Sequence, residues 1–274
     1  MEGKRSKIAF YKSVAALAIP IILQSMITLS FNMVNSMMMG QLGEIELAAI
    51  SLCNQGLDFF NILCQGGLGV VILTAQFWGS KDIKAWKQSF TLMLRIILSI
   101  AVIMMVLLLA IPNQLMSLFS PDPQVISQGA GYMQMYAFAL IPMALSVTMT
   151  MVLRTIRQVN IPLAASIVAF FVNIGVNYAF IFGNFGVPAL GVRGAALGII
   201  CARCCEMVII CGYTLFIDKK VGYRIPDFFK PCMMQFKNYV SYGMPVAVSD
   251  LFMAGAYTAM AMVTGHVSTL YAAA

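Results

Sequence analysis

The chain has 274 residues, of which 61% are hydrophobic and 10% are charged, and it carries a net charge of +7 at pH 7. A soluble domain of this length cannot bury so much apolar surface, so the composition excludes a water-soluble protein. Nucleic-acid binding is also excluded, because the basic residues are spread along the chain without base-reading groups beside them.

Long charge-free stretches predict membrane-spanning helices. They cover 13–43, 59–80, 96–121, 123–153 and 158–192. Each reaches the ~20 apolar residues that a helix needs to cross a bilayer, and a backbone in lipid must satisfy its own hydrogen bonds. We therefore expect an all-α integral membrane protein with helices at 13–39, 47–78, 89–112, 125–153, 161–183, 191–217 and 238–265.

The basic residues alternate along the chain and predict its topology. Fifteen of the 17 Lys and Arg fall in 1–12, 79–95, 154–157 and 218–237. Cytoplasmic loops are enriched in Lys and Arg, so we expect a multi-pass protein of the plasma membrane with a cytoplasmic N-terminus. The predicted units are a cytoplasmic N-terminus at 1–12, a six-helix lobe at 13–217, a cytoplasmic linker at 218–237 and the first helix of a second lobe at 238–274.

An internal repeat supports the second lobe. Lys12 precedes Pro20 by eight residues, and Lys237 precedes Pro245 by the same interval. Both prolines are expected inside helices, where a missing backbone hydrogen bond permits a bend. Because six spans is an even number, the second unit would begin on the same side of the membrane as the first. We expect the chain to be one lobe of a two-lobe, twelve-helix protein, ending about one helix into the second lobe.

Polar residues at helical spacing predict an interior polar site. The first helix carries Gln24, Thr28, Asn32 and Asn35, the second carries Asn54, Asp58, Asn61 and Gln65, and the fifth carries Ser166, Asn173 and Asn177. Each set falls on one helical face. Amides that face lipid are costly, so the stripes should face one another, either as hydrogen bonds between helices or as the lining of a cavity or ion pathway.

Three charged residues lie well inside the first six predicted spans. Arg203 and Glu206 are three residues apart and can form an ion pair on one helix face. That pair could fix helix packing, or it could take part in coupling. Asp58 has no basic residue within its own predicted helix, and it could be a hydrogen-bonded structural acid or a coupling acid.

Several short motifs follow one another in order along the predicted helices. The first helix has Leu17-Ala18-Ile19-Pro20, Asn32-Met33-Val34-Asn35 and Gly40-Gln41-Leu42-Gly43, and the second has Leu47-Ala48-Ala49-Ile50 and Ala75-Gln76-Phe77-Trp78-Gly79. Further segments are Asn173-Ile174-Gly175-Val176-Asn177-Tyr178 and Gly191-Val192-Arg193-Gly194-Ala195-Ala196. Together these segments resemble MATE (multidrug and toxic compound extrusion) transporters. The resemblance implies a monomeric secondary transporter of two six-helix lobes that exports drugs or organic cations by alternating access, coupled to H⁺ or Na⁺.

The chain departs from this family pattern at the coupling positions. Proton-coupled members commonly carry an aspartate after the valine of the first helix, where this chain has Asn35, and some carry another where it has Asn177. Sodium-type members often use a glutamate of the seventh helix at the position of Met253. An amide cannot titrate, so Asp58 and Glu206 are the carboxylates of the first lobe that could couple, and the ion is left open.

Two other functions are compatible with the pattern. A flippase for lipid-linked oligosaccharides or polysaccharides would need a cavity rich in Arg and Lys, and the interior of the predicted spans holds only Arg203. A chain that ended at Ala274 in the cell would be an inactive partial transporter. We expect no enzyme activity, catalytic residue, metal site or cofactor other than the coupling ion, since the sequence has no nucleophile–base set, metal-ligand cluster or phosphate loop.

Overall fold

Among the described residues of the computed structural model, all secondary structure is helical. Described are 2–66, 68–218, 222–230, 232–245, 248, 249, 252, 253, 255–257, 259, 260 and 263, without the side chains of 2–10, 13, 59–69, 185, 225, 233, 234 and 242. The helices are α1 (Glu2–Gly40), α2 (Glu44–Gly66), α3 (Leu68–Gly79), α4 (Ile83–Ala110), α5 (Pro112–Ser117), α6 (Pro123–Tyr136), η1 (Ala137–Ala139), α7 (Leu140–Thr155), α8 (Asn160–Phe182), η2 (Asn184–Gly186), α9 (Val192–Gly212), η3 (Tyr213–Ile217), α10 (Ile225–Phe228) and α11 (Met233–Tyr242).

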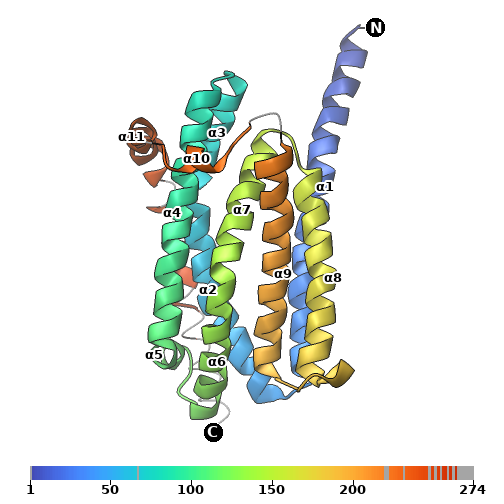
Figure 1. Ribbon diagram of the computed structural model, residues 1–274, viewed down its shortest axis with the longest axis vertical. Coiled ribbons are helices and arrows are strands. Elements are labelled where there is room, and N and C mark those ends of the chain that lie inside the picture. Colours follow the sequence, from blue (N-terminus) through green and yellow to red (C-terminus); the bar gives the residue numbers. More distant parts are fainter. Residues whose placement is uncertain are drawn as a thin grey trace.

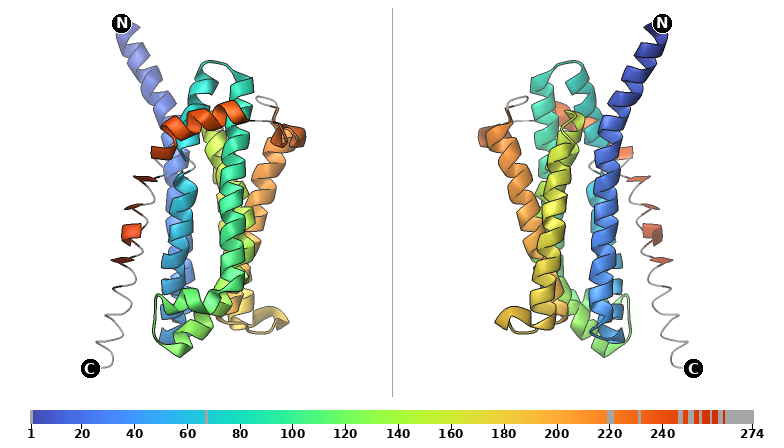
Figure 2. Two further views of the ribbon diagram at one scale, coloured as in Figure 1. Left: turned by 90° about the vertical axis from the view of Figure 1, so that its left-hand side faces the viewer. Right: turned by 90° about the vertical axis from the view of Figure 1, so that its right-hand side faces the viewer.

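The long helices form an up-and-down bundle (Figure 1). Successive spans run in alternating directions, in the order α1, α2–α3, α4, α6–α7, α8 and α9. Figure 2 shows this arrangement from two further sides. Five helical segments of the described chain are long and apolar enough to cross a membrane: Val14–Gly40, Ile83–Ala110, Pro123–Thr155, Asn160–Phe182 and Val192–Ile217. The apolar core lies between α4, α7 and α9, and it includes the buried side chains of Trp86, Phe90, Leu140, Leu153 and Ile210.

The observed helix boundaries refine the expected ones. The fourth expected helix is not regular throughout: α6 and α7 are joined by the tighter turn η1, just before Pro142, whose ring nitrogen cannot donate a helical hydrogen bond. The second expected helix corresponds to α2 and α3, and Gly67 between them lies outside the described residues. Pro20 lies inside α1. Pro245 comes two residues after the turn at Gly243 that ends α11, so it lies where a helix restarts instead of deep inside one.

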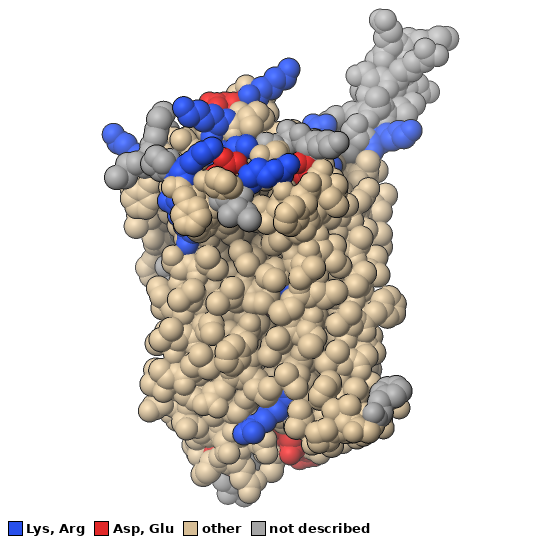
Figure 3. All heavy atoms as spheres, in the orientation of Figure 1, with Lys and Arg blue, Asp and Glu red and all other residues tan. Residues whose placement is uncertain are grey.

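On the face drawn in Figure 3, most of the charged side chains gather at the two ends of the bundle. We call one of them the basic end. It includes the α3–α4 turn at 80–82, the α7–α8 turn at 156–159, the described residues of 218–232, and the adjoining parts of α1, α4 and α11. Arg193, with Glu44 and Glu46, belongs to the opposite end, where α1 meets α2 and α8 meets α9. The uneven distribution of basic residues that the sequence predicts is therefore present in three dimensions.

A close helix contact joins α8 and α9 at Gly194. A Cβ atom added at Gly194 would lie 2.6 Å from the main-chain oxygen of Phe180 and 2.9 Å from the nitrogen of Ile181. Small residues at such positions let two helix backbones approach each other, which is the common way for helices to pack in lipid. Gly194 therefore sets the spacing that allows polar side chains of α8 to reach α9.

We expect Gly194→Ala to destabilise the lobe by about 1–3 kcal/mol, because the added methyl meets main-chain atoms that cannot rotate away. The measurement is thermal unfolding of the purified protein in detergent. Gly212→Ala is the matched control, since it adds the same methyl to the same helix with nothing within 4 Å. Equal melting temperatures for the two variants would contradict the assigned role of Gly194.

Candidate functional site

A charged network joins four helices inside the lobe, and its members are Arg154, Gln24, Ser166, Glu206 and Arg203. Arg154 of α7 donates to Gln24 Oε1 of α1 at 2.7 Å, and Gln24 Nε2 donates to Ser166 Oγ of α8 at 3.0 Å. Ser166 Oγ donates in turn to Glu206 Oε1 of α9 at 3.1 Å. The predicted ion pair is present, with Arg203 donating to Glu206 Oε2 at 2.8 Å. Both oxygens of the buried carboxylate are thus occupied.

A small pocket opens beside this network. Its lining includes Thr28, Phe31, Ser166, Arg203 and Glu206, and its volume of about 30 Å³ has room for a water-sized group. The guanidinium of Arg203 lies 5.6 Å from the centre of the Phe31 ring, close enough for a cation–π interaction. The pocket therefore brings one carboxylate, one guanidinium and two hydroxyl groups to a shared space between α1, α8 and α9.

An amide cluster of Asn35, Asn173 and Asn177 lies farther along α1 and α8. Asn177 Nδ2 donates to Asn35 Oδ1 at 2.6 Å and to Asn173 Oδ1 at 3.1 Å. Asn173 and Asn177 are almost fully buried, and within the described chain Asn173 Nδ2 and Asn177 Oδ1 have no hydrogen-bond partner. Gln24 and Asn35 are 11 residues apart in α1. The amide cluster is therefore ~16 Å along the helix from the charged network.

Gly198 of α9 makes the space for the amide cluster. A Cβ atom at this position would overlap Asn177 Oδ1 and come within 3.2 Å of Asn173 Nδ2. The absence of a side chain at Gly198 lets the two amides press against the α9 backbone.

The other predicted site residues are placed apart from these two groups. Asn54 of α2 is exposed and accepts a hydrogen bond from Tyr132 of α6 at 3.4 Å. Thr28, Asn32 and Asp58 are also exposed, although Thr28 lines the small pocket and donates to Gln24 O. The side chain of Asn61 lies outside the described residues. Asn54 and Asp58 do not join the two groups between α1, α8 and α9, because α2 packs on α6 instead of facing α8.

Sequence analysis missed three contributors to this region. Arg154 was assigned to a basic loop, yet from the last turn of α7 its side chain reaches Gln24. Tyr132 and Phe31 carried no polar periodicity that would single them out. The only signal for Arg154 is its position directly after a charge-free span, which places a long side chain within reach of the interior.

These features define a class, a multi-span helical membrane protein with ionisable groups inside the bundle, as expected of a transport protein. The MatE family model matches residues 20–179, more than half of the chain. The chain belongs to the MATE family of transporters.

Relatives and solved structures agree with this assignment. Probable multidrug resistance proteins NorM of Agrobacterium fabrum and Rhizobium meliloti are 25% and 27% identical to the chain over 280 and 263 residues, which cover 99% and 94% of it. The matches span 59% and 56% of those proteins, so the chain is little more than half their length. The structure of the MATE multidrug transporter DinF-BH has a TM-score of 0.84 at 18% identity, covering 95% of this chain and 58% of that one. It shares the fold.

We expect Gly198→Ala to break the bond between Asn35 and Asn177, because the added methyl displaces a side-chain amide that can rotate away. In the unaltered protein, Asn35→Ala should cost ~0.6 kcal/mol, a typical value for one hydrogen bond between membrane helices. The same substitution should then cost nothing in the Gly198→Ala background. A double-mutant cycle of unfolding free energies measures this coupling, and purely additive costs would show that Gly198 does not support the cluster.

Proposed function

We propose that the chain forms the first lobe, and the start of the second, of a proton-coupled exporter of drugs or other organic cations. The observation that carries the proposal is the Arg203–Glu206 pair beside a small polar pocket inside a lobe of the MATE fold. The names of the NorM relatives, multidrug resistance proteins, support the substrate class. Enclosing a substrate between two lobes would require a second lobe beyond this chain.

The proposed orientation has the basic end in the cytoplasm. Lys12, Lys81, Lys84, Arg157 and Lys237 are exposed there, whereas the opposite end carries Arg193 with Glu44 and Glu46. Short loops rich in Lys and Arg remain on the cytoplasmic side during insertion. We infer from this a plasma-membrane protein with its N-terminus inside the cell.

Glu206 is the proposed coupling group. It is a buried carboxylate, and its two oxygens accept hydrogen bonds from Ser166 and Arg203. A proton that binds to Glu206 would leave the charge of Arg203 uncompensated in a site of low dielectric constant. A different arrangement of the helices around Arg203 would then become the more stable one. A conformational equilibrium that shifts on protonation in this way couples proton binding to a conformational change.

The proposed coupling ion is H⁺ and not Na⁺. The pocket offers carboxylate and hydroxyl oxygens, but the Arg203 guanidinium shares the same 30 Å³ of space. A fixed positive charge beside the carboxylate opposes any cation, but Na⁺ also needs several oxygen ligands in space that the guanidinium shares, whereas a proton needs only one carboxylate oxygen. The amide cluster cannot supply coupling through protonation, because amides do not titrate.

The same electrostatics favour cationic substrates. Protonation of Glu206 raises the positive potential around Arg203, which disfavours an organic cation nearby and so promotes its release. The exposed polar residues of α1 and α2, Thr28, Asn32, Asn54 and Asp58, are the proposed pathway on the open face of the lobe. A flippase for pyrophosphate-linked substrates is less well supported, since Arg154 and Arg203 are both engaged by side chains of the network.

Glu206→Gln should reduce proton-driven transport to the level of vesicles without the protein, because the amide cannot bind and release a proton. The assay uses inside-out membrane vesicles from cells that express the full-length protein. Uptake of a fluorescent organic cation is measured under an imposed pH gradient. A matched series with an imposed Na⁺ gradient tests the ion. Thermal unfolding confirms that the variant is folded.

Asp58→Asn is the matched control, since it makes the same carboxylate-to-amide change at an exposed acid of α2. It should retain proton-driven transport at saturating cation, and only the KM for the cation should rise, because Asp58 lies on the proposed pathway. If Asp58→Asn abolishes proton-driven transport and Glu206→Gln does not, the coupling role belongs to Asp58. If a Na⁺ gradient alone drives uptake, the assignment of H⁺ is wrong.

A further inference from the structure

The segment after η3 is fixed to α4 by a set of bonds that we call the linker clasp, formed by Lys87, Thr91 and Arg95 of α4. Lys87 donates to Gly222 O at 2.7 Å and to Asp227 Oδ2 at 3.0 Å. Thr91 is 3.0 Å from the Tyr223 hydroxyl and donates to Asp227 O at 3.3 Å. Arg95 donates to Phe228 O, and to Lys230 O at 3.1 Å. The three residues recur every fourth position, so they form one stripe of α4.

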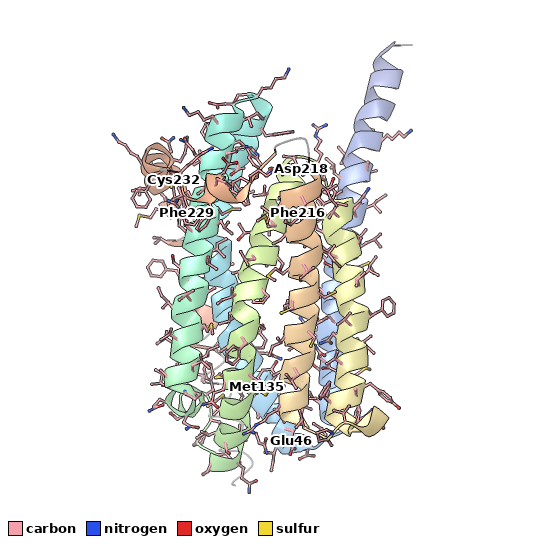
Figure 4. All side chains as sticks on the ribbon, viewed as in Figure 1. Glu46, Met135, Phe216, Asp218, Phe229 and Cys232 are labelled. Atoms are coloured by element: carbon pink, nitrogen blue, oxygen red, sulfur yellow. The ribbon has the colours of Figure 1, made fainter. Side chains whose placement is uncertain are left out.

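The clasp gives this segment a defined shape, which includes a groove at the end of the α9–η3 span. The groove is lined by Leu215, Phe216, Arg224 and Pro226 and has a volume of about 340 Å³. Figure 4 shows Phe216 and Phe229 at the basic end of the bundle. Both rings are about three-quarters exposed, at 77% and 76%. An apolar wall with one guanidinium thus lies where a span leaves the membrane.

The guanidinium of Arg224 is available for an anion. Its hydrogen bonds go to the main-chain oxygens of Leu215 and Tyr223, and it takes part in no ion pair within the described chain. The nearest acidic residue along the chain, Asp227, already forms ion pairs with Lys87 and Lys230. Burial alone would raise the pKa of Asp227, but hydrogen bonds from Lys230 and Lys87 and from the main-chain N–H of Arg224 lower it to about 2. Asp227 therefore stays ionised and bound to the two lysines at neutral pH.

We propose that the groove between η3 and α10 binds one anionic phospholipid, with its phosphate on Arg224 and an acyl chain along Phe216 and Leu215. The proposal uses the orientation proposed above, in which the basic end faces the cytoplasmic leaflet, but it does not depend on transport. That leaflet is rich in anionic lipids, and basic residues at its surface attract them. Exposed Phe next to basic side chains is the composition of interfacial lipid-binding segments.

A phospholipid would contact both the Arg224 guanidinium and the apolar wall of the groove, whereas a small anion would contact only the guanidinium. Free phosphate would engage Arg224 and leave Phe216 and the rest of the apolar wall in contact with water. A zwitterionic lipid would cover the apolar wall, but its ammonium group would lie close to the Arg224 guanidinium. An anionic headgroup joined to an acyl chain satisfies both the charge and the apolar surface.

The test is native mass spectrometry of the purified protein in detergent with added dioleoylphosphatidylglycerol, dioleoylphosphatidylcholine or glycerol 3-phosphate. We expect one phosphatidylglycerol to be retained in preference to phosphatidylcholine, and no retained glycerol 3-phosphate. Arg224→Gln should weaken phosphatidylglycerol retention about fivefold, the effect of one basic residue at an anionic surface. Arg224→Lys should restore it, and Phe216→Ala should weaken it through the lost acyl contact.

Lys12→Gln is the matched control, because it removes one exposed positive charge from the basic end on α1, away from α10. It should bind phosphatidylglycerol as the unaltered protein does. Equal retention by Arg224→Gln and the unaltered protein overturns the proposal, as does equal retention of phosphatidylcholine or strong retention of glycerol 3-phosphate. The loss of lipid in Arg224→Gln with normal efflux would support this site, whatever the outcome for Glu206.

Discussion

The lobe depends on one constraint: a polar side chain inside lipid must find its hydrogen-bond partner within the protein. Ser166 meets this constraint for three helices at once, because it accepts from Gln24 of α1 and donates to Glu206 of α9. Those bonds are possible only where the helix axes are close. Gly194 and Gly198 supply that closeness, since main-chain atoms of Phe180 and the Asn177 side chain occupy the space where a Cβ would be. Packing and polar chemistry are thus two aspects of the same contact.

The two polar groups differ in what they can do. The amide cluster is neutral in every protonation state available near neutral pH, so it can only rearrange its hydrogen bonds. The charged network contains a carboxylate and two guanidinium groups, so a single proton changes the sum of its charges. The lobe therefore places ionisable side chains at the level of Glu206, nearer the basic end, and a neutral, buried group beyond them.

Much of the fold was predictable, because hydropathy and charge placement report on the bilayer directly. The inward orientation of Asn35, Asn173 and Asn177 was predictable too, since helical periodicity decides which residues share a face. Their partners were not, because partners depend on which helices become neighbours. Asn54 has the same stripe pattern, but α2 packs on α6, so it meets Tyr132. Arg154 was missed for a different reason: a long side chain can enter the interior from a residue counted with a loop.

The linker clasp has a consequence for how this segment can change over evolution. Four of its bonds end on main-chain oxygens, those of Gly222, Asp227, Phe228 and Lys230, and not on side chains. Main-chain oxygens are present whatever residue occupies a position. Side chains of this segment, including those that line the groove, can therefore differ between related proteins while its main-chain hydrogen bonds to α4 are kept. The three α4 residues must then stay the same.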